Sequence, residues 1–241
     1  RQRQMCIRDR KYDVYPIQFD TQERSGVKAT FWKLQMGGAW TVPAVELVQG
    51  EPKGTTLLVA DGGRATAAPE AARLLSAGQR VVAIDPFYFG ESKIASRDFL
   101  FALLVSAVGE RPLGLQASQV SAAARWCQTQ FKSGPVTLVA KGPRASLFAL
   151  VAAGLEESAI GRVELHESLG SLKEVIEQNY SVDQKPELFC FGLLEAFDIR
   201  QLAALVAPRP LAFEQSSQRV KTELGELAPW YAMLGGRLVI Q

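Results

Sequence analysis

The sequence predicts an α/β domain in which helices flank a mostly parallel, twisted β-sheet. A chain of 241 residues, 47% hydrophobic and 22% charged, has the composition of a globular domain with one large core. Two continuous apolar runs, TTLLVA (55–60) and RVVAID (80–85), are typical of parallel strands covered on both faces. Helix-like and strand-like segments alternate from there on, which predicts right-handed β-α-β crossovers.

The segment from Lys11 to about Glu51 follows a different pattern, because its apolar residues alternate with polar ones. VKATFWKLQ (27–35) shows the period of two that half-buried antiparallel strands require. Gly37, Gly38 and Pro43 interrupt this alternation. We therefore expect two or three antiparallel strands ahead of the parallel part of the sheet.

From residue 55 onward the expected elements follow a regular order. PEAARLLSAGQ (69–79) predicts a helix between the first two parallel strands. Two stretches, 86–115 and 167–196, break the order, and we expect them to be excursions at the carboxyl ends of strands, where open α/β sheets place their binding crevice. The remaining expected elements are helix 120–131, strand 135–140, helix 144–156, strand 161–166, helix 199–206, strand 209–214, helix 219–235 and strand 237–241.

Composition argues against several classes of function. The net charge is only +2, with basic residues scattered among 25 acidic ones, so neither nucleic acid nor a membrane surface is expected as a partner. A single histidine and three distant cysteines, Cys6, Cys127 and Cys190, give neither a zinc-ligand spacing nor a disulfide framework. No phosphate-cradling glycine motif follows a strand, so no nucleotide cofactor is expected.

The first ten residues stand apart from the rest of the chain. MCIRDR (5–10) is similar to a translated sequencing adaptor, so we expect residues 1–10 to be non-native and residues 11–241 to form one domain. On this interpretation the domain is a fragment of a longer protein, whose upstream part could hold a catalytic domain. The sequence does not indicate a cellular compartment.

Four strings suggest chemistry at the ends of the expected strands. Each one follows or forms a strand end, and the similarity that they carry together extends over about residues 40 to 241. They are LLVADGGRA (57–65), AIDPFYFGES (83–92), LVAKGPRAS (138–146) and APRPLAF (207–213).

In this order and at this spacing the strings resemble the α/β-hydrolase superfamily, in particular its branch of acetyl-xylan esterases and dienelactone hydrolases. The first string resembles the family's His-Gly-Gly loop, with Asp61 in place of the histidine. The second resembles its Asp-x-x-Gly-x-Gly-x-Ser segment at Asp85, Gly90 and Ser92. The third lies on the nucleophile elbow, and the fourth resembles the strand before the catalytic acid. The resemblance implies the α/β-hydrolase fold, an acylated carbohydrate as substrate class and a secreted or periplasmic location.

The elbow departs from the family pattern Gly-x-Ser-x-Gly at its two reactive positions. Gly142 stands where the nucleophilic serine belongs and has no hydroxyl group. Pro143 follows it and has no backbone N–H to stabilise an oxyanion. Glycine at the turn and proline at the first helical position are both good structural choices. We therefore predict that the shape of the turn is kept while its chemistry is lost.

The other members of a catalytic triad are also out of place. Glu214 is the only candidate acid after the expected strand 209–214, and no histidine follows the last strand. His166 ends an earlier strand, so it is displaced from the position of the base. Ser146 lies inside a helix, where a hydroxyl normally bonds a backbone carbonyl, and Ser92 is an equally weak nucleophile candidate.

The remaining candidate residues cluster at the expected carboxyl ends of strands. Lys141 and Arg144 flank a helix N-terminus that is already positive, so they need either a bound anion or an internal acid such as Asp61, Asp85 or Glu214. Gly62 and Gly63 allow a close backbone approach, which suits either a pocket lined by N–H groups or a plain turn. His166, next to Glu164 and Glu167, suits either a titrating site or a structural hydrogen bond.

Two functions remain open on this evidence. The first is a catalytically degenerate domain with a structural or ligand-binding role, whose ligand is a small anion or an acylated carbohydrate bound near Asp61, Gly62, Asp85, Lys141, Gly142, Arg144, His166 and Glu214. The second is an active carboxylic ester hydrolase with a non-standard catalytic set. In that case His166, Ser92 and Asp85 are the conceivable participants. The fold alone does not decide between them.

Overall fold

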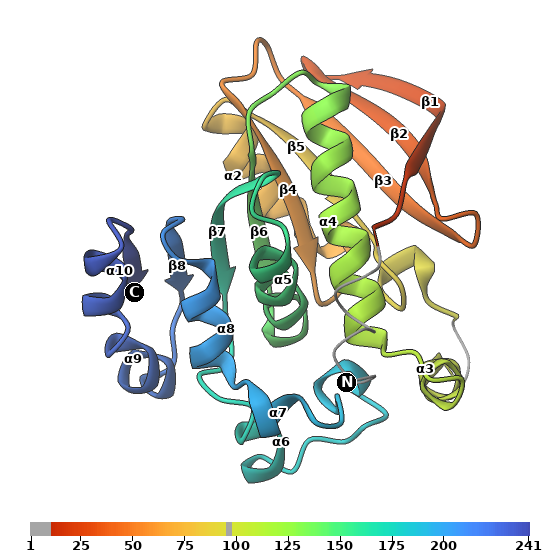
Figure 1. Ribbon diagram of the computed structural model, residues 1–241. Helices are drawn as coiled ribbons and strands as arrows, with labels where there is room; N and C mark the ends of the chain where they lie inside the picture. The colour runs from red at the N-terminus through yellow and green to blue at the C-terminus, as the bar shows by residue number, and fades with distance from the viewer. Residues whose placement is uncertain (1–10, 95–97) are drawn as a thin grey trace.

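The computed structural model describes residues 11–94 and 98–241, so the expected adaptor segment 1–10 lies outside the described residues. Nine strands form one mixed sheet in the order β1-β2-β3-β5-β4-β6-β7-β8-β9. Helices cover the sheet on both faces (Figure 1). This is the α/β architecture that the apolar runs predict.

Three antiparallel strands open the described part of the chain, at the upper end of the expected number. They are β1 (Val14–Arg24), β2 (Val27–Met36) and β3 (Trp40–Val48), and β3 pairs antiparallel with β5. β2 and β3 bury every second residue, as the alternating pattern requires, whereas β1 is exposed along almost its whole length.

The remaining strands are parallel, and the predicted runs locate them within a few residues. Their carboxyl ends lie together at one edge of the sheet, at the bottom of the view in Figure 1. They are β4 (Gly54–Ala60), β5 (Gln79–Ile84), β6 (Val136–Lys141), β7 (Ile160–His166), β8 (Leu211–Glu214) and β9 (Leu238–Ile240).

The two faces of the sheet are covered unequally. On one face, α4 (Pro112–Gln130), α5 (Pro143–Leu155) and α8 (Ile199–Val206) pack over the sheet, with α5 between the other two. On the opposite face, α2 (Ala68–Ser76) packs on β4, β5 and β6 through a smaller apolar cluster. The helix at 199–206 has the bounds predicted for it.

Two helix predictions were wrong. α4 begins at Pro112 rather than at residue 120, because proline suits a first helical turn and the residues after it are buried against the sheet. The single helix expected at 219–235 is two helices, α9 (Gln218–Gly225) and α10 (Ala228–Met233). Pro229 lacks the N–H that a continuous helix would need and therefore opens a new helix.

The two irregular stretches lie at the carboxyl edge of the sheet, as predicted. The first carries the short helix η3 (Gly90–Ser92) and α3 (Asp98–Ala107). The second carries α6 (Glu174–Glu177), η4 (Pro186–Leu188) and α7 (Leu193–Ala196), which lie below the strand ends in Figure 1. Among the described helices, none has the length and apolar character needed to cross a bilayer.

Candidate functional site

The turn between β6 and α5 has the strand–turn–helix form predicted for residues 138–146. β6 ends at Lys141 and α5 begins at Pro143, so Gly142 alone makes the turn. Gly142 has φ 98° and ψ 159°, a region of backbone conformation that is essentially restricted to glycine. Its N–H donates to the carbonyl oxygen of His166 (3.0 Å), which ties the turn to the end of β7.

The N-terminus of α5 is capped by a side chain from another strand end. Asp61, the residue after β4, accepts hydrogen bonds from the backbone N–H of Ala145 (2.7 Å) and of Arg144 (3.3 Å). A helix N-terminus leaves such N–H groups without intrahelical partners, and its dipole favours a negative charge there. Asp61 therefore takes the role that an external anion would otherwise have at this helix.

Asp61 also explains why residue 142 is glycine. A Cβ atom built on Gly142 would lie 2.4 Å from Cγ of Asp61 and 2.7 Å from both of its carboxylate oxygens. A serine at position 142 therefore collides with the carboxylate, in addition to its unfavourable φ. The carboxylate lies where a nucleophile would need space.

Burial controls the ionisation of Asp61. Because the carboxyl group is removed from water, its pKa is raised from 3.8 to about 6, although the hydrogen bonds from Ala145 and Arg144 oppose the shift. Asp61 thus titrates close to the physiological range while holding a helix N-terminus.

The cation at the start of α5 has an internal partner that the sequence did not reveal. The guanidinium of Arg144 makes a two-pronged ion pair with Glu187, whose side chain is fully buried, and lies 4.4 Å from the ring centre of Phe89. Asp61, which the sequence offered as a partner, bonds only the backbone of Arg144. Glu187 comes from the second excursion, 43 residues further along, and no spacing rule connects it to the elbow.

Asp85 is an internal structural residue. Its carboxylate is buried and accepts hydrogen bonds from the N–H of Arg64 (2.7 Å) and of Glu91 (3.0 Å), with the Nε atom of Arg64 at 3.2 Å. These contacts fix the loop after β4 against the loop after β5. Asp85 is therefore not presented to a ligand.

The two serine candidates are engaged by the backbone. The hydroxyl of Ser92 donates to the carbonyl oxygen of Asp85 (2.7 Å). Ser146 is completely buried, and its hydroxyl donates to a backbone carbonyl oxygen, that of His166 at the end of β7 (3.4 Å), rather than to one in its own helix. Neither hydroxyl contacts an imidazole nitrogen that could activate it.

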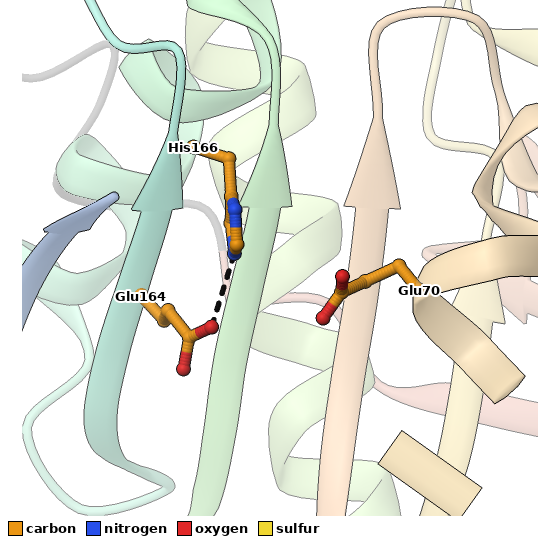
Figure 2. A group of neighbouring side chains, drawn as sticks. All are labelled: Glu70, Glu164 and His166. Atoms are coloured by element: carbon orange, nitrogen blue, oxygen red, sulfur yellow. Dashed lines mark hydrogen bonds and ion pairs between the residues drawn. The ribbon is translucent and has the colours of Figure 1, made fainter. Parts of the chain in front are cut away.

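His166 belongs to a charged cluster on the face that carries α2 (Figure 2). Its Nε2 atom lies 3.0 Å from Glu164, and this hydrogen bond, together with the charge of Arg73, lowers the pKa of that carboxyl group. Arg73 bridges Glu164 (3.0 Å) and Glu70 (2.5 Å). Lys141 lies 4.0 Å from Glu70, so it too has an internal acidic neighbour.

Part of the predicted crevice exists as an open pocket of about 190 Å³ at the carboxyl edge of the sheet. It brings together four of the eight predicted site residues. Arg144, Asp85 and His166 do not line it, and Glu214 lines a different hollow of about 130 Å³ over β7, β8 and β9. The pocket is lined by Ala60, Asp61, Gly62, Thr66, Lys141, Gly142, Pro143 and Glu167.

Comparison with known proteins gives a fold but no close relative. No protein-family model matches the chain, and no curated protein sequence matches it. A Bacteroides fragilis structure described as an acetyl xylan esterase superposes with a TM-score of 0.80 at 15% identity, over 95% of this chain and 70% of the other. The chain has the α/β-hydrolase fold.

Other structures with the α/β-hydrolase fold agree. An acetyl xylan esterase from Paenibacillus sp. R4 has a TM-score of 0.62 at 9% identity, with 100% of this chain and 84% of that chain covered. A dienelactone hydrolase from Anabaena variabilis has a TM-score of 0.52 at 14% identity, with 96% and 87% covered. The fold predicted from the four strings is confirmed, and identities this low say nothing further about activity.

Proposed function

We propose that this domain is a catalytically inactive relative of carbohydrate esterases with a structural or ligand-binding role. The observation that carries the proposal is the position of Asp61. Its carboxylate bonds the free N–H groups at the start of α5 and fills the space beside Gly142. The position that a nucleophile would need in this fold is therefore blocked by an internal acid, and the helix N-terminus beside it is already capped.

Three further features support inactivity. Gly142 has no hydroxyl group, and Pro143 has no N–H to donate to an oxyanion. In enzymes that use such a donor, removal of one costs about 3 to 4 kcal/mol of transition-state stabilisation. The chain's single histidine bonds Glu164 rather than a hydroxyl group.

The pocket beside Asp61 supports binding of a neutral ligand. Its lining carries two carboxyl groups, Asp61 and Glu167, against one cation, Lys141, which already has Glu70 as a neighbour. This balance disfavours a small anion. An acylated sugar fits better, because hydroxyl groups can bond carboxylate and ammonium groups alike. The acetyl xylan esterase structures of the same fold make this the first ligand class to test.

The test is hydrolysis of p-nitrophenyl acetate and of acetylated xylan by the purified domain, with heat-denatured protein as background. We expect no rate above that background and no labelling by a fluorophosphonate probe. The matched control is His166→Gln, which removes the only imidazole in the chain and therefore its only histidine base. Turnover that this variant or Ser92→Ala abolishes would establish instead the active hydrolase with a non-standard catalytic set.

A second experiment tests binding separately from catalysis. Acetylated xylo-oligosaccharides added to ¹⁵N-labelled protein should shift the amide signals of Gly62, Lys141 and Glu167. Lys141→Ala should weaken these shifts. If the shifts are absent, the ligand-binding role fails and the structural role remains.

A further inference from the structure

Three side chains that can bind a metal converge on the sheet face that carries α2, apart from the elbow. Glu70 comes from α2, and Glu164 and His166 come from β7, where their separation of two residues places them on the same face. The ligand atoms of the three residues all lie within 4.8 Å of one another. His166 Nε2 and Glu164 Oε1 lie 3.0 Å apart.

We propose that Glu70, Glu164 and His166 bind a divalent transition metal of the Zn²⁺ type. One imidazole nitrogen with two carboxylates suits zinc, whereas calcium and magnesium prefer oxygen ligands alone. Zinc–ligand bonds are about 2.0 to 2.2 Å long. The two ligand atoms that lie farthest apart must therefore approach each other by roughly 1 Å. The flexible side chain of Glu70 can supply this movement.

In this structure the guanidinium of Arg73 lies between the two carboxylates, where the proposed metal ion would bind. Its Nη2 atom lies 2.5 Å from Glu70 Oε1 and 3.0 Å from Glu164 Oε1, so one guanidinium nitrogen bridges the two carboxylates. The Arg73 side chain is 53% exposed, whereas those of Glu70, Glu164 and His166 are 7%, 15% and 10% exposed. Metal binding is therefore an exchange in which Arg73 swings into solvent and the buried ligands move by only about 1 Å toward the ion.

The charges around the cluster permit this exchange. Glu70 and Glu164 carry two negative charges, which Arg73 and Lys141 balance. When a divalent ion replaces Arg73, the ion neutralises both carboxylates, and Lys141 remains at 4.0 Å from Glu70 on the other side. Glu214, which interacts electrostatically with Arg73, adds a further negative charge near the cluster. The exchange thus leaves no large uncompensated charge.

The spacing rules used on the sequence could not find this site. They test cysteines and histidines at short intervals, and this chain has a single histidine. Here two of the three ligands are glutamates, and Glu70 lies 94 residues before Glu164. The register of β7 beside β6 and the packing of α2 on the sheet bring them together.

Untagged protein titrated with Zn²⁺ by calorimetry tests the site directly. We expect one ion per chain. The ¹⁵N signals of the imidazole should report binding without ambiguity, because His166 is the only histidine. Co²⁺ in place of Zn²⁺ should give visible absorption from a site of low coordination number. An unchanged imidazole spectrum at saturating Zn²⁺ would overturn the proposal, since the ion would then be bound elsewhere, for example by cysteine.

Variants separate a metal site from an internal ion-pair network. Glu164→Gln and His166→Gln should weaken Zn²⁺ binding at least about tenfold, the scale on which even outer-shell partners act. Arg73→Ala should strengthen it by roughly tenfold, because a competing cation is removed. Glu51→Gln, at an exposed acid remote from the cluster in the fold, is the matched control and should change nothing. Equal or weaker binding by folded Arg73→Ala protein would contradict the exchange and leave the cluster a salt-bridge network.

Discussion

Asp61 and Asp85 directly follow the adjacent parallel strands β4 and β5, and they have similar structural roles. Each carboxylate accepts hydrogen bonds from two backbone N–H groups. Each also abuts a glycine with positive φ, since a Cβ atom on Gly142 would approach Asp61 and one on Gly90 would lie 2.2 Å from Asp85. The two sites are built on the same plan.

They differ in how the negative charge is balanced. Arg64 contacts Asp85 directly, and its Nη2 atom also reaches Glu91 at 2.5 Å. Among the described residues no cationic side chain makes an ion pair with Asp61, because Arg144 is committed to Glu187. Burial then raises the pKa of Asp61 to about 6. Backbone N–H groups thus hold the Asp61 carboxylate in place without preventing the rise of its pKa on burial.

The largest expected effect comes from removing the charge at Asp85. Asp85→Asn leaves the nearly buried Arg64 without its buried partner, and we expect the free energy of unfolding to fall by about 3 to 5 kcal/mol. Asp61→Asn at pH 7 should cost at most ~1 kcal/mol, because the lost hydrogen bond is offset by relief of desolvation. Urea denaturation of both variants measures the difference. Equal losses would show that the two carboxylates are balanced alike.

The next effect concerns the glycine beside Asp61. Gly142→Ser should lower the free energy of unfolding by about 3 kcal/mol, because a side chain at φ 98° is strained and meets the carboxylate. Gly142→Ala is the control and should cost nearly as much, since the Cβ atom and not the hydroxyl causes the clash.

A double variant sharpens this test. Asp61→Gly combined with Gly142→Ser should lose less stability than the sum of the single losses, because the first change removes the contact that the second creates. Strictly additive losses would mean that Asp61 does not restrict position 142. The serine created in this way should still show no esterase activity.

The titration of Asp61 gives a smaller, pH-dependent effect. Its pKa in the folded protein, about 6, is above the ordinary value of 3.8, so the folded state binds this proton more tightly than the unfolded state. The stability contributed by the protonated form is complete below pH 3.8 and is lost as the pH rises to about 6. The loss is at most about 3 kcal/mol, from roughly 1.4 kcal/mol per pKa unit. The difference between wild type and Asp61→Asn should show this slope, and a flat difference would refute it.

The smallest effect is expected at Pro143. Pro143→Ala restores a backbone N–H at the start of α5 and should lower stability by at most ~1 kcal/mol through the greater freedom of the unfolded chain. It should produce no hydrolysis of p-nitrophenyl acetate, because no nucleophile stands beside the new donor. A measurable gain in rate would contradict the proposed inactivity, because it would require a nucleophile from another position to act beside the restored donor.

Local patterns predicted much of the fold. Continuous apolar runs located the parallel strands, alternation located the antiparallel opening, and the string around Gly142 located the elbow. The same reasoning merged α9 with α10, because the apolar spacing continues across the proline at 229. For the site, the sequence identified Asp61, Gly62, Lys141 and Gly142 as neighbours, and these residues do line one pocket. It did not find Glu187 or Glu70, which reach their partners only through long excursions and helix packing.

The sequence by itself determined that position 142 has no hydroxyl group and position 143 no backbone N–H, because these are covalent properties of glycine and proline. The tertiary structure alone decided what took their place. Hydrogen bonds from N–H groups at the start of α5 hold the Asp61 carboxylate beside the turn, and the packing of α2 on the sheet brings Glu70 close to Glu164 and His166. Such contacts depend on distances in space between residues far apart in the chain, and those distances exist only once the sheet has formed.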